Sequence, residues 1–194
     1  MREAVALFPG QGSQSVGMGR ALFEECPEAR SVFEAADDAL GFALSRLAFE
    51  GPDEELTLTR NTQPAILMHS VAALRVLAAR GFAPTAAAGH SLGEYSAYVA
   101  AGSLTFEDAI RLVRRRGELM YEAGVARPGA MAAVLGLTDS QVEEVCRDAA
   151  DTGIVVPANR NSPGQVVLSG EEAAVERAME LAMMAGAKKS VRLP

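Results

Sequence analysis

The sequence contains no tryptophan, and only two cysteines and two histidines occur among its 194 residues. Cys26 and Cys146 lie far apart and match no metal-binding or redox spacing, so we expect two reduced, buried thiols. No apolar run reaches the length of a membrane span, and the run from Ala4 to Phe8 is too short for a signal peptide. These features predict a cytoplasmic protein without a membrane partner.

Positive charge is also scarce: 18 Lys and Arg residues oppose 25 Asp and Glu residues, which gives a net charge of −7. Proteins that bind nucleic acid through phosphate contacts show the opposite balance, so no nucleic-acid partner is expected. The 49% of hydrophobic residues is ordinary for a globular protein. A chain of this length can form one domain, or one domain with a small insertion.

The first glycine-rich loop lacks the spacing of a nucleotide site. Gly10, Gly12 and Gly17 follow the apolar run, but they give neither the dinucleotide fingerprint nor a P-loop, because Met18 stands where a P-loop needs lysine. Neither a nucleotide cofactor nor a metal ion is expected anywhere in the chain. The loop instead offers backbone that can approach a ligand closely, with amides free to donate hydrogen bonds.

The strongest catalytic pattern is Gly89-His90-Ser91-Leu92-Gly93, between a short apolar run and a helix-forming stretch. Gly-x-Ser-x-Gly between strand and helix is the pattern of a nucleophile elbow, in which a sharp turn exposes the serine hydroxyl. The start of the following helix favours a negative charge nearby. The alternative is an ordinary tight turn with an exposed serine.

Helices are predicted over 20–25, 28–40, 64–80 and 92–101. For the third of these, Asn61 or Thr62 is the expected N-cap and Pro64 belongs to the first turn. His69 falls outside the apolar stripe of that helix, so we expect a flanking or surface histidine and not a base.

Another helix should begin after Thr105, with Thr105 and Asp108 as a capping pair. Arg116 falls at the edge of its apolar stripe, whereas Arg111, Arg114 and Arg115 point away and are expected to form a solvated face. An arginine turned inward needs an anion, and guanidinium is well shaped to hold a carboxylate. The anion could be an internal Asp or Glu, or a ligand.

Residues 128–194 show a different pattern, with strands expected over 130–137, 154–159, 165–169 and 188–193, and helices over 138–150 and 171–185. The order β-α-β-β-α-β is that of a ferredoxin-like unit. We therefore predict an α/β protein: an incomplete α/β-hydrolase-like parallel-sheet subdomain over 1–127, and a ferredoxin-like small subdomain over 128–194.

Five motifs occur in order and cover essentially the whole chain: Phe8-Pro9-Gly10-Gln11-Gly12-Ser13-Gln14, Thr62-Gln63-Pro64-Ala65, Gly89-His90-Ser91-Leu92-Gly93-Glu94-Tyr95, Arg116-Gly117-x-x-Met120, and Asn159-x-Asn161-Ser162-Pro163-Gly164-Gln165. Together they resemble the malonyl-CoA:acyl carrier protein transacylase family. The free-standing bacterial enzyme of type-II fatty acid synthesis is the better match, and the acyltransferase domains of polyketide synthases are similar.

The resemblance implies a malonyl group carried from malonyl-CoA to the phosphopantetheine thiol of acyl carrier protein through a malonyl ester of Ser91. Backbone amides of Gln11 and Leu92 would form the oxyanion hole, and Arg116 would bind the free carboxylate of malonate. Four more positions match family residues near the site: Gln63, His90, Asn159 and Asn161. Malonyl-CoA is thus a substrate, and the expected partner is acyl carrier protein.

The sequence departs from the family in one respect. The family takes its general base from a Ser-His motif that follows the small subdomain, and neither His69 nor His90 matches that histidine. The expectation is therefore a fragment whose own activity is weak or absent, since an unactivated serine is a weak nucleophile. A truncated gene, a deliberately shortened chain and completion by a second polypeptide all fit.

Two other functions remain open. A generic serine esterase or thioesterase shares the elbow but has no use for an inward cation such as Arg116. A non-catalytic module that binds acyl groups or carrier protein would leave the Gly-x-Ser-x-Gly pattern without a purpose. For an acidic carrier protein, Lys188 and Lys189, with Arg192 nearby, are the candidate docking residues; the alternative is an ordinary exposed strand.

Overall fold

A computed structural model describes residues 4–193 of the chain. Two compact units are distinguished, one ending at Glu122 and the other beginning at Ala123. The helix α7 (Phe106–Ala126) contains this boundary, and our expected boundary at 127/128 lies directly after it. The two units are described separately.

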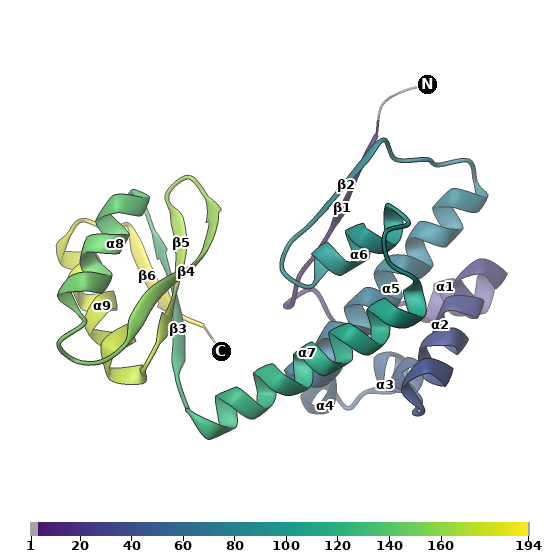
Figure 1. The fold of residues 1–194 in the computed structure, drawn as a ribbon, viewed down its shortest axis with the longest axis horizontal. Helices are drawn as coiled ribbons and strands as arrows, with labels where there is room; N and C mark the ends of the chain where they lie inside the picture. Colours follow the sequence, from purple (N-terminus) through teal and green to yellow (C-terminus); the bar gives the residue numbers. More distant parts are fainter. Residues whose placement is uncertain (1–3, 194) are drawn as a thin grey trace. The chain divides into compact units, whose positions relative to one another are not determined.

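The first unit contains a small two-stranded parallel sheet (Figure 1). Strands β1 (Val5–Phe8) and β2 (Ala86–Gly89) pair in register, with Val5 opposite Ala86 and Phe8 opposite Gly89. Ala6 and Phe8 are buried against Ala97 of α6 (Gly93–Ala100). The apolar run predicted a strand buried on both faces, but Val5 and Leu7 are 56% and 76% exposed. Alternate side chains point to opposite faces, and only one face of β1 is covered.

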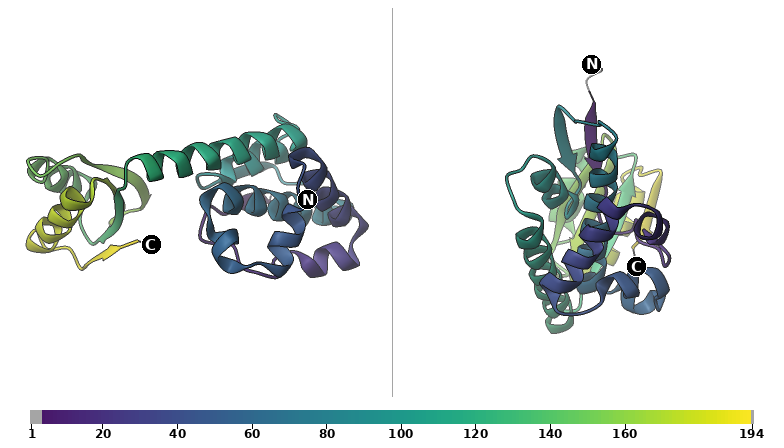
Figure 2. Two further views of the ribbon diagram at one scale, coloured as in Figure 1. Left: turned by 90° about the horizontal axis from the view of Figure 1, so that it is seen from below. Right: turned by 90° about the vertical axis from the view of Figure 1, so that its right-hand side faces the viewer.

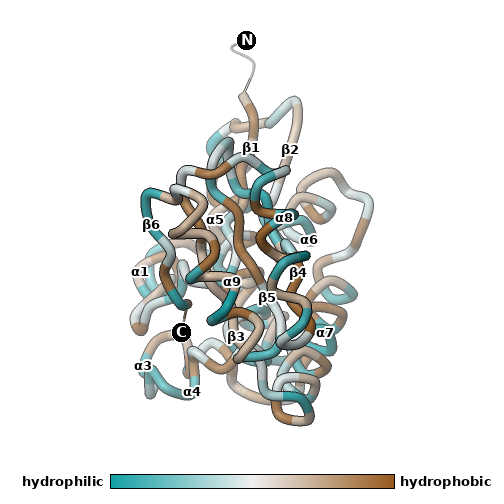
Figure 3. Tube along the Cα trace, turned by 90° about the vertical axis from the view of Figure 1, so that its left-hand side faces the viewer, coloured by the Kyte–Doolittle hydropathy of each residue, from teal (hydrophilic) through white to brown (hydrophobic). Residues whose placement is uncertain are grey.

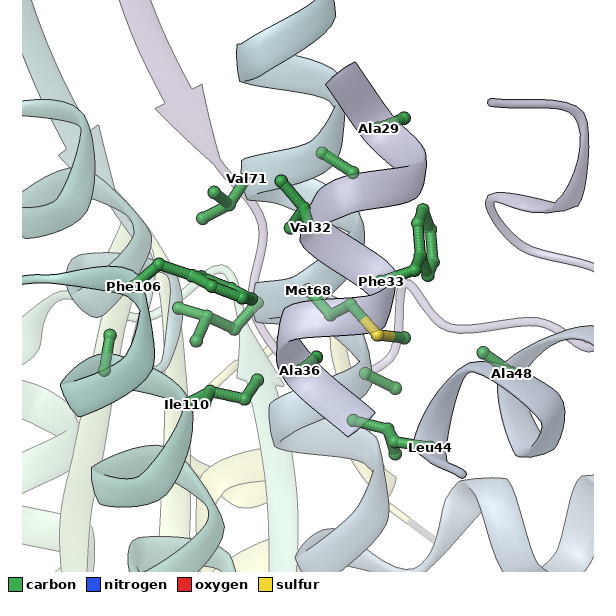
Figure 4. Close-up of a cluster of buried hydrophobic side chains, with 14 of the residues drawn as sticks. Ala29, Val32, Phe33, Ala36, Leu44, Ala48, Met68, Val71, Phe106 and Ile110 are labelled. Atoms are coloured by element: carbon green, nitrogen blue, oxygen red, sulfur yellow. The ribbon is translucent and has the colours of Figure 1, made fainter. Parts of the chain in front are cut away.

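Most of the apolar core of this unit lies between helices. Four helices precede the long α5: α1 (Arg20–Glu25), α2 (Pro27–Leu40), α3 (Leu44–Glu50) and α4 (Asp53–Thr57). Figure 4 shows how α2 presents Val32 and Phe33 to Met68 of α5, with Leu44 and Ile110 closing the cluster. The sequence did not indicate α3 and α4, because helices of seven and five residues are too short to show a helical period.

Helix α5 (Thr59–Ala79) begins five residues before the predicted start, so Pro64 lies inside it. The predicted caps are wrong as well: Asn61 and Thr62 are buried and donate to the carbonyl oxygens of Glu55 and Leu56, at 2.8 and 2.6 Å. Pro64 has no N–H to pair with the carbonyl of Arg60. Arg114 Nη1 donates to that oxygen instead, at 3.0 Å. A contact from a distant helix thus replaces the missing helical bond.

Helix α7 runs as one continuous helix in the left view of Figure 2. Thr105 precedes it and accepts from the backbone N–H of Asp108 at 3.2 Å, which confirms the predicted capping pair. Its buried face packs into the core of the first unit through Phe106, Ala109, Ile110 and Val113.

The second unit is a four-stranded antiparallel sheet in the order β4-β5-β3-β6, which confirms the predicted ferredoxin-like arrangement. Its elements are β3 (Ala130–Leu135), α8 (Asp139–Asp148), β4 (Val155–Ser162), β5 (Gln165–Gly170), α9 (Glu172–Met184) and β6 (Lys189–Arg192). Helices α8 and α9 bury one face of the sheet (Figure 1). Hydrophobic and hydrophilic segments alternate along the tube of this unit in Figure 3. In α8, Val142 and Val145 are among the buried residues.

Helix α8 has the predicted cap. Thr138 accepts from the backbone N–H of Gln141 at 3.3 Å, and the Gln141 side chain accepts from the N–H of Thr138 at 2.9 Å. Across residues 4–193, no helix is both long and apolar enough to cross a membrane.

Candidate active site

Ser91 sits on a strained turn between β2 and α6. Its φ of 55° is the only positive value among the non-glycine residues that the structure describes. An L side chain pays for this conformation, so the position indicates a functional demand. Its side chain is exposed, as a nucleophile elbow requires.

Glycines allow the elbow to be this tight. A Cβ on Gly89 would collide with the backbone of Gly93, and one on Gly93 would collide with the carbonyl of Phe8 at the end of β1. The first loop is equally close, because a Cβ on Gly10 would lie 2.7 Å from His90 Nδ1. The backbone before Gln11 therefore lies directly against the residue before Ser91.

The backbone amides of Gln11 and Leu92 donate to no acceptor within residues 4–193, and the same holds for those of Gly10 and Ser91 beside them. The Gln11 side chain is held by a hydrogen bond from its Nε2 to Thr59 Oγ1 at 3.1 Å. Leu92 itself is fully buried at the start of α6. Unpaired amides beside a strained serine are the arrangement that an oxyanion hole requires.

Arg116 is half-buried and reaches the nucleophile. Its Nη2 donates to Ser91 Oγ at 3.0 Å, and its Nη1 donates to Gln63 Oε1. Both acceptors are neutral, and no carboxylate of the described chain lies within ion-pair distance of this guanidinium. Of the two anions that the sequence left open, an internal Asp or Glu is therefore not found among residues 4–193.

Gln63 holds Arg116 from the side of α5. It is fully buried, and its Nε2 donates to Met120 Sδ at 3.2 Å while its Oε1 accepts from Arg116. The two helices meet at Gly117, where a Cβ would lie 2.8 Å from both Arg60 Cα and the carbonyl oxygen of Thr59. Only glycine permits this approach, and the approach brings Gln63 within reach of Arg116.

His90 and the candidates in the second unit complete the predicted set. His90 is exposed, with its ring against Gly10. Asn159 lies on β4 opposite Val167, after a bulge between Pro157 and Asn159 that places it on the sheet face away from α8 and α9. Asn161 lies on the same strand, and Lys188 and Lys189 are exposed at the start of β6. Arg192 is ion-paired with Glu172 and Glu176.

Sequence reasoning missed three residues of this neighbourhood. Thr59 supports Gln11, and Met120, which was quoted only as part of a motif, accepts from Gln63. Arg114 was assigned to a solvated face, but its side chain is 22% exposed and bonds to Arg60, Asn61 and Glu118. The missing N–H of Pro64 inside a predicted helix was the one available signal, because a freed carbonyl needs another donor.

The arrangement can do one kind of chemistry well. An exposed serine, unpaired amides beside it and a cation bonded to its oxygen suit attack on an acyl carbonyl whose acyl group carries its own negative charge. The guanidinium would hold that charge while the amides stabilise the tetrahedral oxyanion.

Comparison with known proteins agrees with this chemistry. A model of the acyl transferase domain matches residues 5–193. The malonyl CoA-acyl carrier protein transacylase of Bacillus subtilis (strain 168) is 50% identical over 194 residues, 100% of this chain and 61% of that protein. The crystal structure of an acyl carrier protein S-malonyltransferase from Vibrio cholerae O1 biovar eltor gives a TM-score of 0.94 at 48% identity and covers 100% of this chain and 63% of that one.

A malonyl-transacylase solved in complex with its type II polyketide acyl-carrier protein gives a TM-score of 0.92 at 47% identity, and covers 99% of this chain and 62% of that one. The chain thus spans between 61% and 63% of the length of these relatives. The chain therefore belongs to the acyl transferase domain family.

Proposed function

We propose that this chain transfers a malonyl group from malonyl-CoA to the phosphopantetheine thiol of acyl carrier protein. One observation carries the proposal: Arg116 bonds to Ser91 Oγ and has no acidic partner in the described chain. A half-buried cation without an anion is costly, so the site fits an acyl group that brings a carboxylate.

The transfer has two halves. Ser91 Oγ attacks the thioester carbonyl, the amides of Gln11 and Leu92 hold the oxyanion, and collapse of the intermediate expels the CoA thiolate and leaves a malonyl ester. The carrier-protein thiol then attacks that ester by the same route, which restores Ser91. The Ser91 proton must pass to a base, and we assign this role to no residue of these 194.

The site and the relatives favour malonyl transfer over the two other functions, a generic esterase and a binding module without catalysis. A generic esterase for neutral acyl groups would leave the charge of Arg116 unused, and a binding module without catalysis would not need the strain at Ser91. The malonyl-transacylase solved with its polyketide carrier protein supports a carrier protein as the acceptor here. A polyketide-type acyltransferase is the second candidate, since the site chemistry is shared.

The intact mass of the purified chain after incubation with malonyl-CoA tests the proposal. The expected result is a gain of one malonyl group that is lost in Ser91→Ala. A second form, in which these residues are joined to the remaining segment of the Bacillus subtilis relative, should load faster and pass the group to carrier protein. If neither form loads, the proposed function is wrong.

We further propose that residues 1–127 and 128–194 serve as the large and small subdomains of a cytoplasmic enzyme, with Asn159 and Asn161 near the substrate. Lys188 and Lys189 are the proposed contacts for an acidic carrier protein. Reversal of both charges to glutamate should then raise the KM for carrier protein at low salt and leave malonyl loading unchanged. An unchanged KM would exclude these lysines as docking residues.

A further inference from the structure

Gly117 divides the neighbouring residues of α7 into two groups. At about 100° per residue, residues 114 and 118 lie on one side of Gly117, and residues 116 and 120 lie on the other. The second pair holds Gln63, as described above. Arg114, together with Glu118, holds the turn of α5 that comes immediately before Gln63.

Arg114 makes the contacts on that side. Its Nη1 donates to the carbonyl oxygen of Arg60 at 3.0 Å and to Asn61 Oδ1 at 2.6 Å, and its Nε donates to Glu118 Oε1 at 2.8 Å. The guanidinium also lies over the Phe42 ring, 5.0 Å from its centroid. The hydrogen bond from Arg114 is the main cause that lowers the pKa of Glu118, so the carboxylate stays charged and available.

The carbonyl of Arg60 gives this contact its importance. Pro64 supplies no N–H to it, and Gly117 brings α7 against the same residue. Without Arg114, the carbonyl oxygen of Arg60 would lose the hydrogen bond that it accepts at the helix crossing. The first turn of α5 would then be free to shift. Gln63 is in the next turn, and it orients the guanidinium of Arg116.

We propose that Arg114 is a positioning residue for malonyl selectivity: it holds the first turn of α5 so that Gln63 directs Arg116 at the carboxylate of the acyl group. The inference rests on the proposed function. It assigns Arg114 no contact with substrate, and no part in the attack by Ser91.

The test compares Arg114→Met with wild type in whichever of the two forms loads, using malonyl-CoA and acetyl-CoA. Because a lost charge-assisted hydrogen bond to a part-buried carbonyl costs about 1.4 kcal/mol or more, we expect the KM for malonyl-CoA to rise about tenfold. Loading by acetyl-CoA, which has no carboxylate for Arg116, should change less than about twofold. A merely structural role would lower both rates together.

Two further variants sharpen the test. Pro64→Ala restores an N–H that can reach the Arg60 carbonyl, so added to Arg114→Met it should recover malonyl selectivity by at least about threefold. Arg115→Met is the matched control, since the side chain of Arg115 is 58% exposed and, within residues 4–193, pairs with Glu118 and Glu122 and forms no ion pair or hydrogen bond with α5. It should behave like wild type.

A readout without catalysis separates the two proposals. Binding of free malonate to the 194-residue chain, followed by the NMR shift of the Arg116 guanidinium, should weaken about tenfold in Arg114→Met and stay unchanged in Arg115→Met. If wild type loads and Arg114→Met keeps its selectivity and malonate affinity, the inference is wrong. If neither wild-type form loads a malonyl group, the proposed function fails, and the malonate affinities of the variants still decide the role of Arg114. If the wild-type chain does not bind malonate, both the proposed function and this inference are wrong.

Discussion

The charge on Arg116 should decide which acyl group reaches Ser91. In Arg116→Met the side chain keeps most of its apolar length but loses the donors that reach Gln63 and Ser91. A bound malonyl carboxylate would lose one or two charge-assisted hydrogen bonds, each worth about 1.5–3 kcal/mol. One or two such bonds together amount to about 1.5–6 kcal/mol. Because the side chain is only half-buried, we take the lower part of this total, about 2–3 kcal/mol, which is about 30-fold to 150-fold in kcat/KM.

The assay is the time course of Ser91 acylation by intact mass, with malonyl-CoA and acetyl-CoA as donors. Acetyl loading should stay within about threefold of wild type, because an acetyl group has no carboxylate to lose. Arg115→Met, one residue along α7 and exposed, is the control and should not alter either rate. An equal loss with both donors would show that Arg116 only maintains the structure, and would remove the basis for a carboxylated substrate.

Three further outcomes follow from the structure. Gly117→Ala should lower the free energy of unfolding in urea by about 1 kcal/mol, because the cost of a forced helix separation exceeds the helix-propensity gain; an increase in stability would show that α5 and α7 can separate freely. Burial lowers the pKa of His69 below 6.5, so the unfolded chain binds a proton that the folded chain does not. The contribution of His69 to the free energy of unfolding should therefore be complete above pH 6.5 and be lost as the pH falls through the pKa of His69 in the folded chain. The variant His69→Gln should reduce this dependence of stability on pH. An unchanged dependence would exclude His69 as its source. Thr138→Ala should lower the free energy of unfolding by about 1 kcal/mol, because it removes the cap of α8, and should not alter malonyl loading of Ser91. A large change in loading would contradict the prediction that this cap affects stability alone.

The helices and strands of the second unit could be predicted from local sequence patterns. Strands and helices of ordinary length alternate there, glycines and a capping threonine mark the ends, and each predicted boundary falls within a few residues of the observed one. The elbow was equally clear, because Gly89, Ser91 and Gly93 carry the requirement for a tight turn in their own residue types.

The first part of α5 could not be read in this way. Pro64 is normally evidence that a helix starts nearby, whereas here the helix continues through it, and Arg114, 50 positions later, supplies the missing donor. A solvated face was the natural interpretation of Arg114 for the same reason: periodicity describes one helix and contains no information on what lies against it. The contact of Thr59 with Gln11 was hidden likewise, since only the fold brings these residues together.

The fit of Gly117 against Arg60 has a practical consequence for recombination between relatives. A chimera that takes α5 from one parent and α7 from another would combine two surfaces that were not selected to pack against each other at Gly117, where an added Cβ would lie 2.8 Å from Arg60 Cα. Crossovers outside residues 59–126 would exchange the serine, its cation and both helices as one block. Such a block is the natural unit for moving acyl preference from one acyltransferase into another.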